Sequence, residues 1–257
     1  MTDITRQRVH VSVAIEGTTN SSFLAELGQI YGPERVLVYN FSGRNFIRLS
    51  ELPYSPAKSI LMKGKEILGN THFFNKNNSD PDKAEAERWY ARRYLPENTA
   101  VVHGTFTPEI FKGIFENPFI SVMLKDPLER MITLFEEWTG SKGEVDWRVS
   151  IPFDKSLKFT EFALKEDFIN FQSKCLGSRR LGDFDLVGIS ECQDGFIAQL
   201  KNKDWTGFLD QNPQTIQFNK PRYRNLEITP EFLEQFQGVH HRDYSIYHQA
   251  KDFIGYC

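Results

Sequence analysis

The chain has 257 residues, of which 40% are hydrophobic, 25% charged and 14% aromatic, as in an ordinary globular protein with ample material for a core. Its 31 Lys and Arg against 34 Asp and Glu leave a formal net charge of −3, so no global basic field draws it to nucleic acid or to a membrane. Any anion-binding site must therefore be local.

The first half of the chain alternates short apolar runs with helical patterns. Residues 9–15 (VHVSVAI) predict a strand, residues 16–22 a polar loop, and residues 23–32 a helix that ends at Gly32. A second strand is expected at 36–39. The less regular stretch 41–98 contains one predicted helix near its end, over residues 82–94.

The second half continues the alternation. We expect strands at 101–102, 119–124 and 184–189, of which 119–124 (FISVML) has the strongest pattern of a buried strand. The expected helical segments are 108–115, 128–138, part of 157–176, 196–203, 230–238 and 243–255. Strands that alternate with helices, with no Pro/Gly/Ser-rich linker, predict a single α/β domain over residues 1–257 with a central, mostly parallel sheet.

The patterns of cysteine, histidine and targeting residues exclude several further classes of protein. Cys175, Cys192 and Cys257 are too scattered for a disulfide framework, and the six histidines show no zinc-ligand spacing, so we expect reduced thiols and no metal. No transmembrane-length apolar run or secretory signal is present, which favours a cytoplasmic protein without a membrane partner. The sequence does not indicate an oligomeric state.

Three segments carry candidate chemistry. The first is the loop between the first strand and the first helix, where backbone N–H groups and hydroxyls at a helix N-terminus can cradle a phosphate or sulfate. It lacks the lysine of a Walker A loop, and the same residue types are ordinary N-caps, so a simple helix start is the alternative. Its residues are Gly17, Thr18, Thr19, Asn20, Ser21 and Ser22.

The second segment follows the strand 119–124, where Lys125-Asp126-Pro127 leads into a helix that carries Arg130 and Thr133. Asp126 is suited to cap this helix and Pro127 to its first position. Ligands of α/β sheets bind at the carboxyl ends of the strands, so Lys125 is placed to meet an anion. A capped helix with solvent-facing charges is the alternative.

The third segment is His103, which ends the strand predicted at 101–102. A histidine there is commonly structural, but beside an anion pocket it is the best candidate for a general base, since its ordinary pKa is near 6.5.

Together these residues resemble the PAPS-dependent sulfotransferases, in the branch of the carbohydrate and heparan sulfate 2-O-sulfotransferases. The segment KDPLERMITLF is similar to the family's RDPxxRxxSxY element, which holds the nucleotide 3′-phosphate, with Lys125, Thr133 and Phe135 replacing its arginine, serine and tyrosine. The resemblance continues, in order, through the family's NxQ…LG run, its DxVGxxE strand and its closing N-K pattern. These lie at 170–177, 184–191 and 219–250.

The first loop departs from the family. Where the family has roughly PKTGGTS, IEGTTNSSF places Glu16 at the proline and Gly17 at the lysine. A cation that stabilises charge developing on the bridging oxygen typically contributes several kcal/mol, so its loss would lower both affinity and rate. Lys63, Lys65, Lys220 and Arg222 are candidates to supply that charge from elsewhere.

The resemblance implies a P-loop-like fold and sulfuryl transfer from PAPS to a hydroxyl acceptor, a carbohydrate or a small molecule, without a metal. It implies that the 5′-phosphate lies on the 17–22 loop and the 3′-phosphate near Lys125 and Thr133, with Arg130 and Lys220 also binding the cofactor. It makes His103 the base. The alternatives are a catalytically impaired binding protein of this fold, favoured by Gly17, and another P-loop-like nucleotide enzyme such as a kinase.

Overall fold

The computed structural model describes residues 8–18, 21–40, 45–51, 95–140, 154, 156–202 and 226–255. Within them, six strands form one sheet with the order β3-β2-β4-β1-β5-β6. The strands are β1 (His10–Val13), β2 (Val36–Asn40), β3 (Asn45–Arg48), β4 (Val101–Gly104), β5 (Phe119–Leu124) and β6 (Leu186–Ile189). All neighbouring pairs are parallel except β2 with β3.

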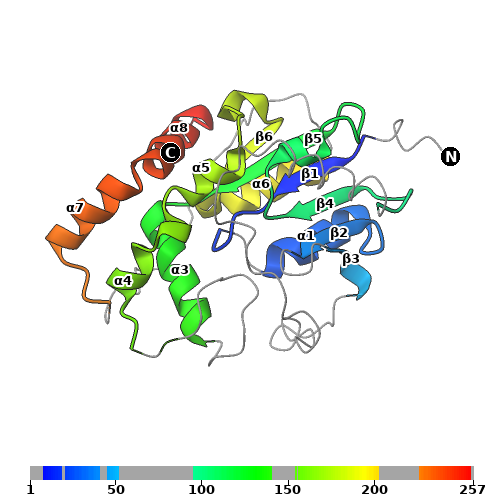
Figure 1. Cartoon of the computed structure of the whole chain (residues 1–257). Coiled ribbons are helices and arrows are strands. Elements are labelled where there is room, and N and C mark those ends of the chain that lie inside the picture. Colours follow the sequence, from blue (N-terminus) through cyan, green and yellow to red (C-terminus); the bar gives the residue numbers. More distant parts are fainter. Residues whose placement is uncertain are drawn as a thin grey trace.

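The helices surround this sheet (Figure 1). The α-helices are α1 (Ser21–Tyr31), α3 (Pro127–Gly140), α4 (Phe159–Ala163), α5 (Phe171–Leu176), α6 (Gln193–Asn202), α7 (Pro230–Val239) and α8 (His241–Phe253). Short 3-10 turns lie at η2 (Leu49–Glu51), η3 (Pro108–Phe111), η4 (Glu166–Phe168), η5 (Leu181–Asp183) and η6 (Ser190–Cys192). The predicted α/β class with a mostly parallel sheet is confirmed.

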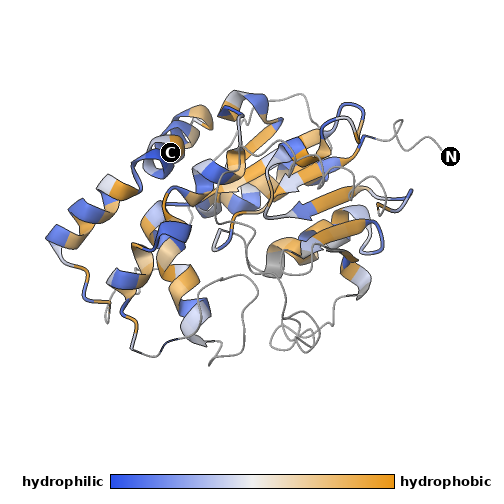
Figure 2. Ribbon diagram, viewed as in Figure 1, coloured by the Kyte–Doolittle hydropathy of each residue, from blue (hydrophilic) through white to orange (hydrophobic). Residues whose placement is uncertain are grey.

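The two faces of the sheet have different coverings. On one face, Phe23 and Leu27 of α1 pack with Phe196 and Leu200 of α6. On the other, Phe171 and Leu176 of α5 and Tyr247 and Ala250 of α8 pack over the odd-numbered residues of β1 and the even-numbered residues of β5. Figure 2 shows the strands mostly in apolar colours, as expected of parallel strands covered on both faces.

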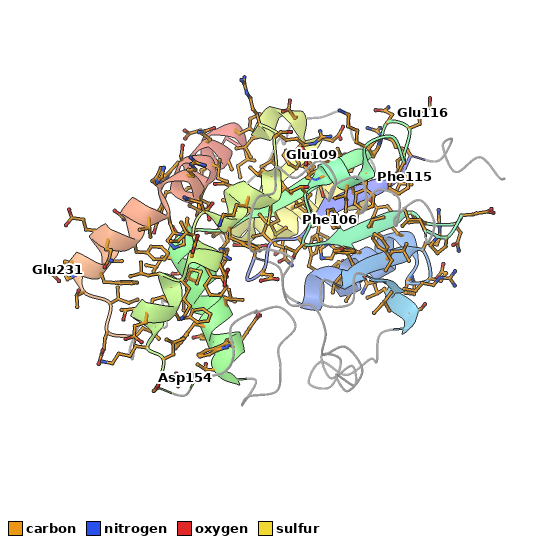
Figure 3. The ribbon with its side chains drawn as sticks, viewed as in Figure 1. Phe106, Glu109, Phe115, Glu116, Asp154 and Glu231 are labelled. Atoms are coloured by element: carbon orange, nitrogen blue, oxygen red, sulfur yellow. The ribbon has the colours of Figure 1, made fainter. Side chains whose placement is uncertain are left out.

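Aromatic rings fill much of the interior, in keeping with the 22 Phe of the chain. Phe111 lies 5.0 Å from Phe106 and 5.5 Å from Phe115 between ring centroids, on the α8 face of the sheet. Figure 3 labels Phe106 and Phe115. A separate cluster joins α3, α4 and α7 through residues that include Trp138, Phe162 and Phe236.

Several helix ends follow their sequence signals. Asp126 Oδ1 accepts hydrogen bonds from the backbone N–H groups of Leu128 (2.9 Å) and Glu129 (3.1 Å), so it caps α3 as expected. Thr229 caps α7 by accepting from Phe232 N at 3.2 Å.

Some predicted boundaries are wrong. The segment 108–115 forms only the four-residue turn η3. The run 157–176, expected to be helical in part, contains α4, η4 and α5. The antiparallel edge strand β3 lies in the stretch that the sequence left irregular. The helix predicted at 82–94 falls outside the described residues.

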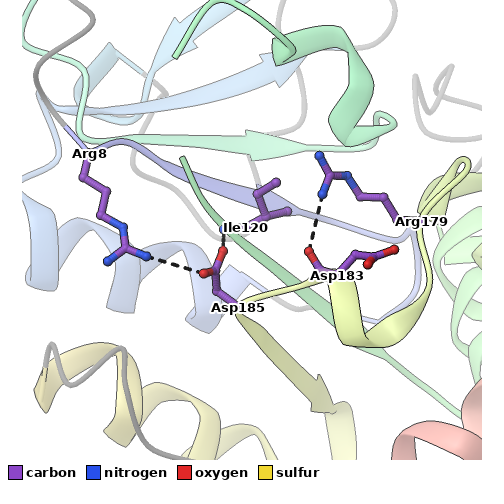
Figure 4. Close-up of polar contacts among 5 residues, drawn as sticks. All are labelled: Arg8, Ile120, Arg179, Asp183 and Asp185. Atoms are coloured by element: carbon purple, nitrogen blue, oxygen red, sulfur yellow. Dashed lines mark hydrogen bonds and ion pairs between the residues drawn. The ribbon is translucent and has the colours of Figure 1, made fainter. Parts of the chain in front are cut away.

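The β5–β6 pair extends beyond the strands through Asp185 (Figure 4). Its backbone N–H donates to Ile120 O at 2.8 Å, and its carboxylate accepts from Ile120 N at 2.8 Å. The same carboxylate pairs with Arg8 at 3.4 Å. Asp185 thereby fastens the entry of β6 to β5 and to the segment that leads into β1.

Candidate functional site

The carboxyl ends of β1 and β5 lie at the point where the strand order of the sheet reverses, the place where the crevice of an open α/β sheet is expected. The chain leaves β1 toward the β2 side of the sheet and leaves β5 toward the β6 side, while β1 and β5 are direct neighbours. Such a reversal is where ligands of open α/β sheets bind, because the two connections diverge and leave the strand ends uncovered. Gly17 follows β1 and Lys125 follows β5, so the fold brings together the first two predicted segments.

Lys125 reaches across this crevice. Its Nζ donates to Gly17 O at 3.3 Å and to Thr133 Oγ1 at 2.8 Å. Burial lowers the pKa of Lys125, and the carboxylates of Glu129 and Glu191 oppose that shift. An ammonium has three N–H donors. The described residues accept from two of them, which leaves one donor for a ligand.

The start of the first loop is held by its own hydrogen bonds. Thr18 closes a tight turn, because its N–H and its hydroxyl both donate to Ile15 O, at 3.0 and 2.6 Å. Gly17 has a φ of 77°, and a Cβ there would lie 2.8 Å from Arg130 O. Ser21 and Ser22 begin α1, while Thr19 and Asn20 lie outside the described residues.

Arg130 lies beneath the loop and is fully buried, with none of its surface exposed. Its guanidinium donates to Glu16 O at 3.3 Å and to Phe168 O at 3.4 Å, and it lies 5.3 Å from the ring centroid of Phe171. Burial lowers the pKa of Arg130, and nearby Asp243 opposes that shift. These contacts make Arg130 a support that ties the first loop to α3 and α5.

His103 lies on the inner side of β4, in register with Ser12 of β1. Its Nδ1 is 2.9 Å from Ser12 Oγ, its ring centroid is 5.5 Å from that of Phe23 of α1, and only 4% of its surface is exposed. Burial lowers the pKa of His103 to about 4. At neutral pH the imidazole is therefore uncharged and a weaker base than a solvated histidine.

A second buried pair lies on the same face of the sheet. His10 Nε2 is 2.7 Å from Ser121 Oγ, and burial lowers the pKa of His10 to about 3. Thus two histidines share the layer beneath α1. The sequence gives no signal for His10, because alternation within a four-residue strand does not reveal which residues lie under a helix.

Gln172 positions the backbone of Lys125, a role that the sequence did not reveal. The Lys125 N–H donates to Gln172 Oε1 at 3.0 Å, and Gln172 Nε2 donates back to Lys125 O at 2.9 Å. Gln172 is fully buried. The resemblance had marked the NxQ run without assigning a role to its side chains.

Asp243 and Asn170 hold Gln172 in turn. The buried Asp243 carboxylate accepts from the N–H groups of Gln172 (3.1 Å) and Ser173 (2.8 Å) and from the Ser173 hydroxyl (2.7 Å). Asn170 Oδ1 accepts from the N–H groups of Arg242 (3.0 Å) and Asp243 (3.3 Å). Helices α5 and α8 thus cap each other across about 70 residues of sequence, a distance at which no local spacing rule applies.

A further basic side chain, Arg179, is occupied by other partners. Arg179 pairs with Glu109 at 3.8 Å and donates to Asp183 O at 3.4 Å (Figure 4). It also lines a shallow hollow of about 340 Å³ between α5 and α8, together with His241 and Arg242. The four basic residues expected to supply charge from elsewhere, Lys63, Lys65, Lys220 and Arg222, lie outside the described residues.

The donor set at the crevice fits an anionic group. Lys125 supplies one charged donor, and the backbone at the start of α1 supplies the positive end of a helix. Arg130 is enclosed by protein, so it does not add a contact at the surface. Of the two cations that the resemblance implies from Lys125 and Arg130, only Lys125 is therefore placed to meet a phosphate or sulfate.

Comparisons with family models, curated proteins and solved structures returned no match to this chain. Among the described segments, no helix has both the length and the apolar character needed to cross a bilayer. The same segments contain no cluster of three or more His, Cys, Asp or Glu side chains arranged to hold a metal ion, and Cys175 and Cys192 are buried free thiols.

The crowding at Gly17 gives a first prediction. We expect Gly17→Ala to lower the free energy of unfolding by about 3 kcal/mol, because it adds a left-handed backbone penalty to a steric clash with Arg130 O. Gly255→Ala is the matched control, since Gly255 has a φ of 66° and nothing within 4 Å of its Cβ position. Chemical denaturation of both variants measures the difference, and equal losses would contradict the close approach.

Proposed function

We propose that this protein is a PAPS-dependent sulfotransferase that transfers a sulfuryl group to a hydroxyl acceptor, a carbohydrate or a small molecule. The observation that carries the proposal is the contact between Lys125 Nζ and Gly17 O at 3.3 Å. It joins the two segments that resemble the nucleotide-binding elements of the family. A parallel sheet with its first strand central, followed by a loop and helix at the crevice, supports a P-loop-like sulfotransferase fold.

Bound PAPS would supply the activated sulfuryl group, with adenosine 3′,5′-bisphosphate as the second product. For the chain's own residues, Lys125 offers a charged hydrogen bond to the cofactor, and Gln172 fixes the backbone from which Lys125 projects. Catalysis of this kind depends mainly on positioning and on electrostatic stabilisation of developing charge.

His103 is the candidate base for the acceptor hydroxyl. To accept a proton at Nε2, its Nδ1 must carry hydrogen and donate to Ser12 Oγ, the partner found at 2.9 Å. Ser12 would then select the reactive tautomer. The low pKa keeps the ring unprotonated at neutral pH, which leaves the nitrogen lone pair available but weakly basic.

A second candidate function is a binding protein of this fold without catalysis. It is favoured by the carboxylates of Glu129, Glu191 and Glu137, all of which interact electrostatically with Lys125. These carboxylates reduce the attraction of the crevice for a polyanionic nucleotide. The replacement of the family's loop lysine by Gly17 favours the same candidate.

Nucleotide binding is tested by thermal unfolding with adenosine 3′,5′-bisphosphate. At 100 times the dissociation constant we expect a stabilisation of about 2.7 kcal/mol, since the ligand binds only the folded state. No shift at millimolar ligand would refute the PAPS site. A shift with ATP that requires magnesium would instead favour a kinase.

Catalysis is tested by transfer of radiolabelled sulfate from PAPS to a panel of hydroxyl acceptors. We expect His103→Ala to lower the rate by roughly 100- to 10,000-fold, the usual contribution of a general base, while nucleotide binding persists. Equal transfer by His103→Ala would exclude the base role. Nucleotide binding without transfer to any acceptor would favour the binding protein.

A further inference from the structure

Lys125 and Thr133 are bound to each other, which changes what each can offer to a ligand. The Thr133 hydroxyl has one proton, and it donates that proton to Glu129 O at 2.9 Å. Its oxygen accepts from Lys125 Nζ at 2.8 Å. Thr133 therefore has no donor left for a phosphate unless its bond to Glu129 O breaks.

The second contact of the Lys125 ammonium shows where its charge lies. Nζ is 3.3 Å from the carbonyl oxygen of Gly17, the residue that occupies the position of the family's loop lysine. The charge missing from the first loop is thus present within one hydrogen bond of it, carried by a side chain from β5 rather than from the loop. Gln172 forms hydrogen bonds with both the N–H and the carbonyl oxygen of Lys125, which fixes the backbone from which the Lys125 side chain extends toward Gly17.

We propose that Lys125 is the cation of the first loop and binds the 5′-phosphosulfate side of the nucleotide, with Thr133 as the acceptor that holds its ammonium in place. This inference rests on the proposed function. It differs from the resemblance, which places Lys125 and Thr133 at the 3′-phosphate. It also explains how a loop with Gly17 in place of lysine can serve an anionic ligand.

The test compares three probes: adenosine 5′-monophosphate, adenosine 3′-monophosphate and adenosine 3′,5′-bisphosphate. Their dissociation constants are measured by calorimetry for the full chain, wild type and Lys125→Met. We expect the substitution to weaken the 5′-monophosphate and the bisphosphate by roughly 10- to 100-fold, the usual loss for a charge-assisted hydrogen bond, and to leave the 3′-monophosphate unchanged. Lys112→Met, at an exposed lysine after η3, is the matched control.

If the Lys125→Met variant keeps its affinity for adenosine 3′-monophosphate, that binding also shows that the variant is folded. Thr133→Val provides a second measurement, because it removes the acceptor of Nζ, and we expect it to weaken the same two probes by a smaller factor. Loss confined to the 3′-monophosphate, or equal loss of all three probes, would overturn the assignment while leaving the nucleotide site intact in the wild type. Failure of the wild type to bind the bisphosphate would refute the proposed function itself.

Discussion

Replacement of Asp243 by alanine is expected to lower the free energy of unfolding by about 3–5 kcal/mol. The substitution removes the acceptor of three hydrogen bonds at the start of α5. It also removes a buried negative charge that interacts with the fully buried Arg130. Denaturant titration followed by circular dichroism measures the loss.

Two further variants show whether charge or capping is responsible. Asp252→Ala removes an exposed carboxylate from the same helix and should change stability by no more than about 0.5 kcal/mol. In an Arg130→Met background, Asp243→Ala should cost less than in the wild type, since the buried guanidinium that interacts electrostatically with the carboxylate is absent. A loss below about 1 kcal/mol for Asp243→Ala alone would contradict the reciprocal capping of α5 and α8.

The second large effect is loss of stability in mild acid. His10 and His103 have folded-state pKa values of about 3 and about 4, both below the ordinary value of 6.5, because both are buried. The unfolded chain therefore binds protons that the folded chain does not. The contribution of the two uncharged histidines to the free energy of unfolding is fully present above pH 6.5 and is lost as the pH falls toward 4. Two protons give a slope of about 2.7 kcal/mol per pH unit.

This slope is measured by urea denaturation at half-unit steps between pH 7.5 and 5. His240, whose pKa burial also lowers, adds in the same direction, whereas Asp126, whose pKa burial raises, acts oppositely at lower pH. His10→Gln removes one of the two titrating groups and should reduce the slope by about 1.4 kcal/mol per pH unit. His248→Gln, at an exposed position on α8, should leave it unchanged, and a flat profile from pH 7 to 5 would contradict the burial of both rings.

The sheet was largely predictable because its strands are short, apolar and buried on both faces. The run FISVML at 119–124 coincides with β5, and the runs at 9–15, 36–39, 101–102 and 184–189 each overlap an observed strand. Asp126 and Pro127 marked the start of α3 for the same local reason, a side chain that satisfies the first N–H groups of a helix. Local rules of this kind need no knowledge of the fold.

The candidate site was predictable only in part. Sequence placed Gly17 and Lys125 at strand ends, but their contact depends on β1 and β5 being neighbours, which the sheet order decides. His103 was expected at the mouth of the pocket, and the structure places it beneath α1 with 4% of its surface exposed. Arg130 was expected to bind the cofactor, and the structure encloses it under the first loop.

Length, composition and a net charge of −3 determined that this is a globular chain in which an anion site must be built locally. The order of strands and helices determined a parallel sheet with its loops at the carboxyl ends. Only the tertiary structure decided which charges meet there. Arg130 is buried and supports the first loop, His103 is buried and uncharged, and Lys125 is the cation that contacts Gly17. Spacing along the chain does not reveal these differences, because desolvation and long-range contacts are set by tertiary packing.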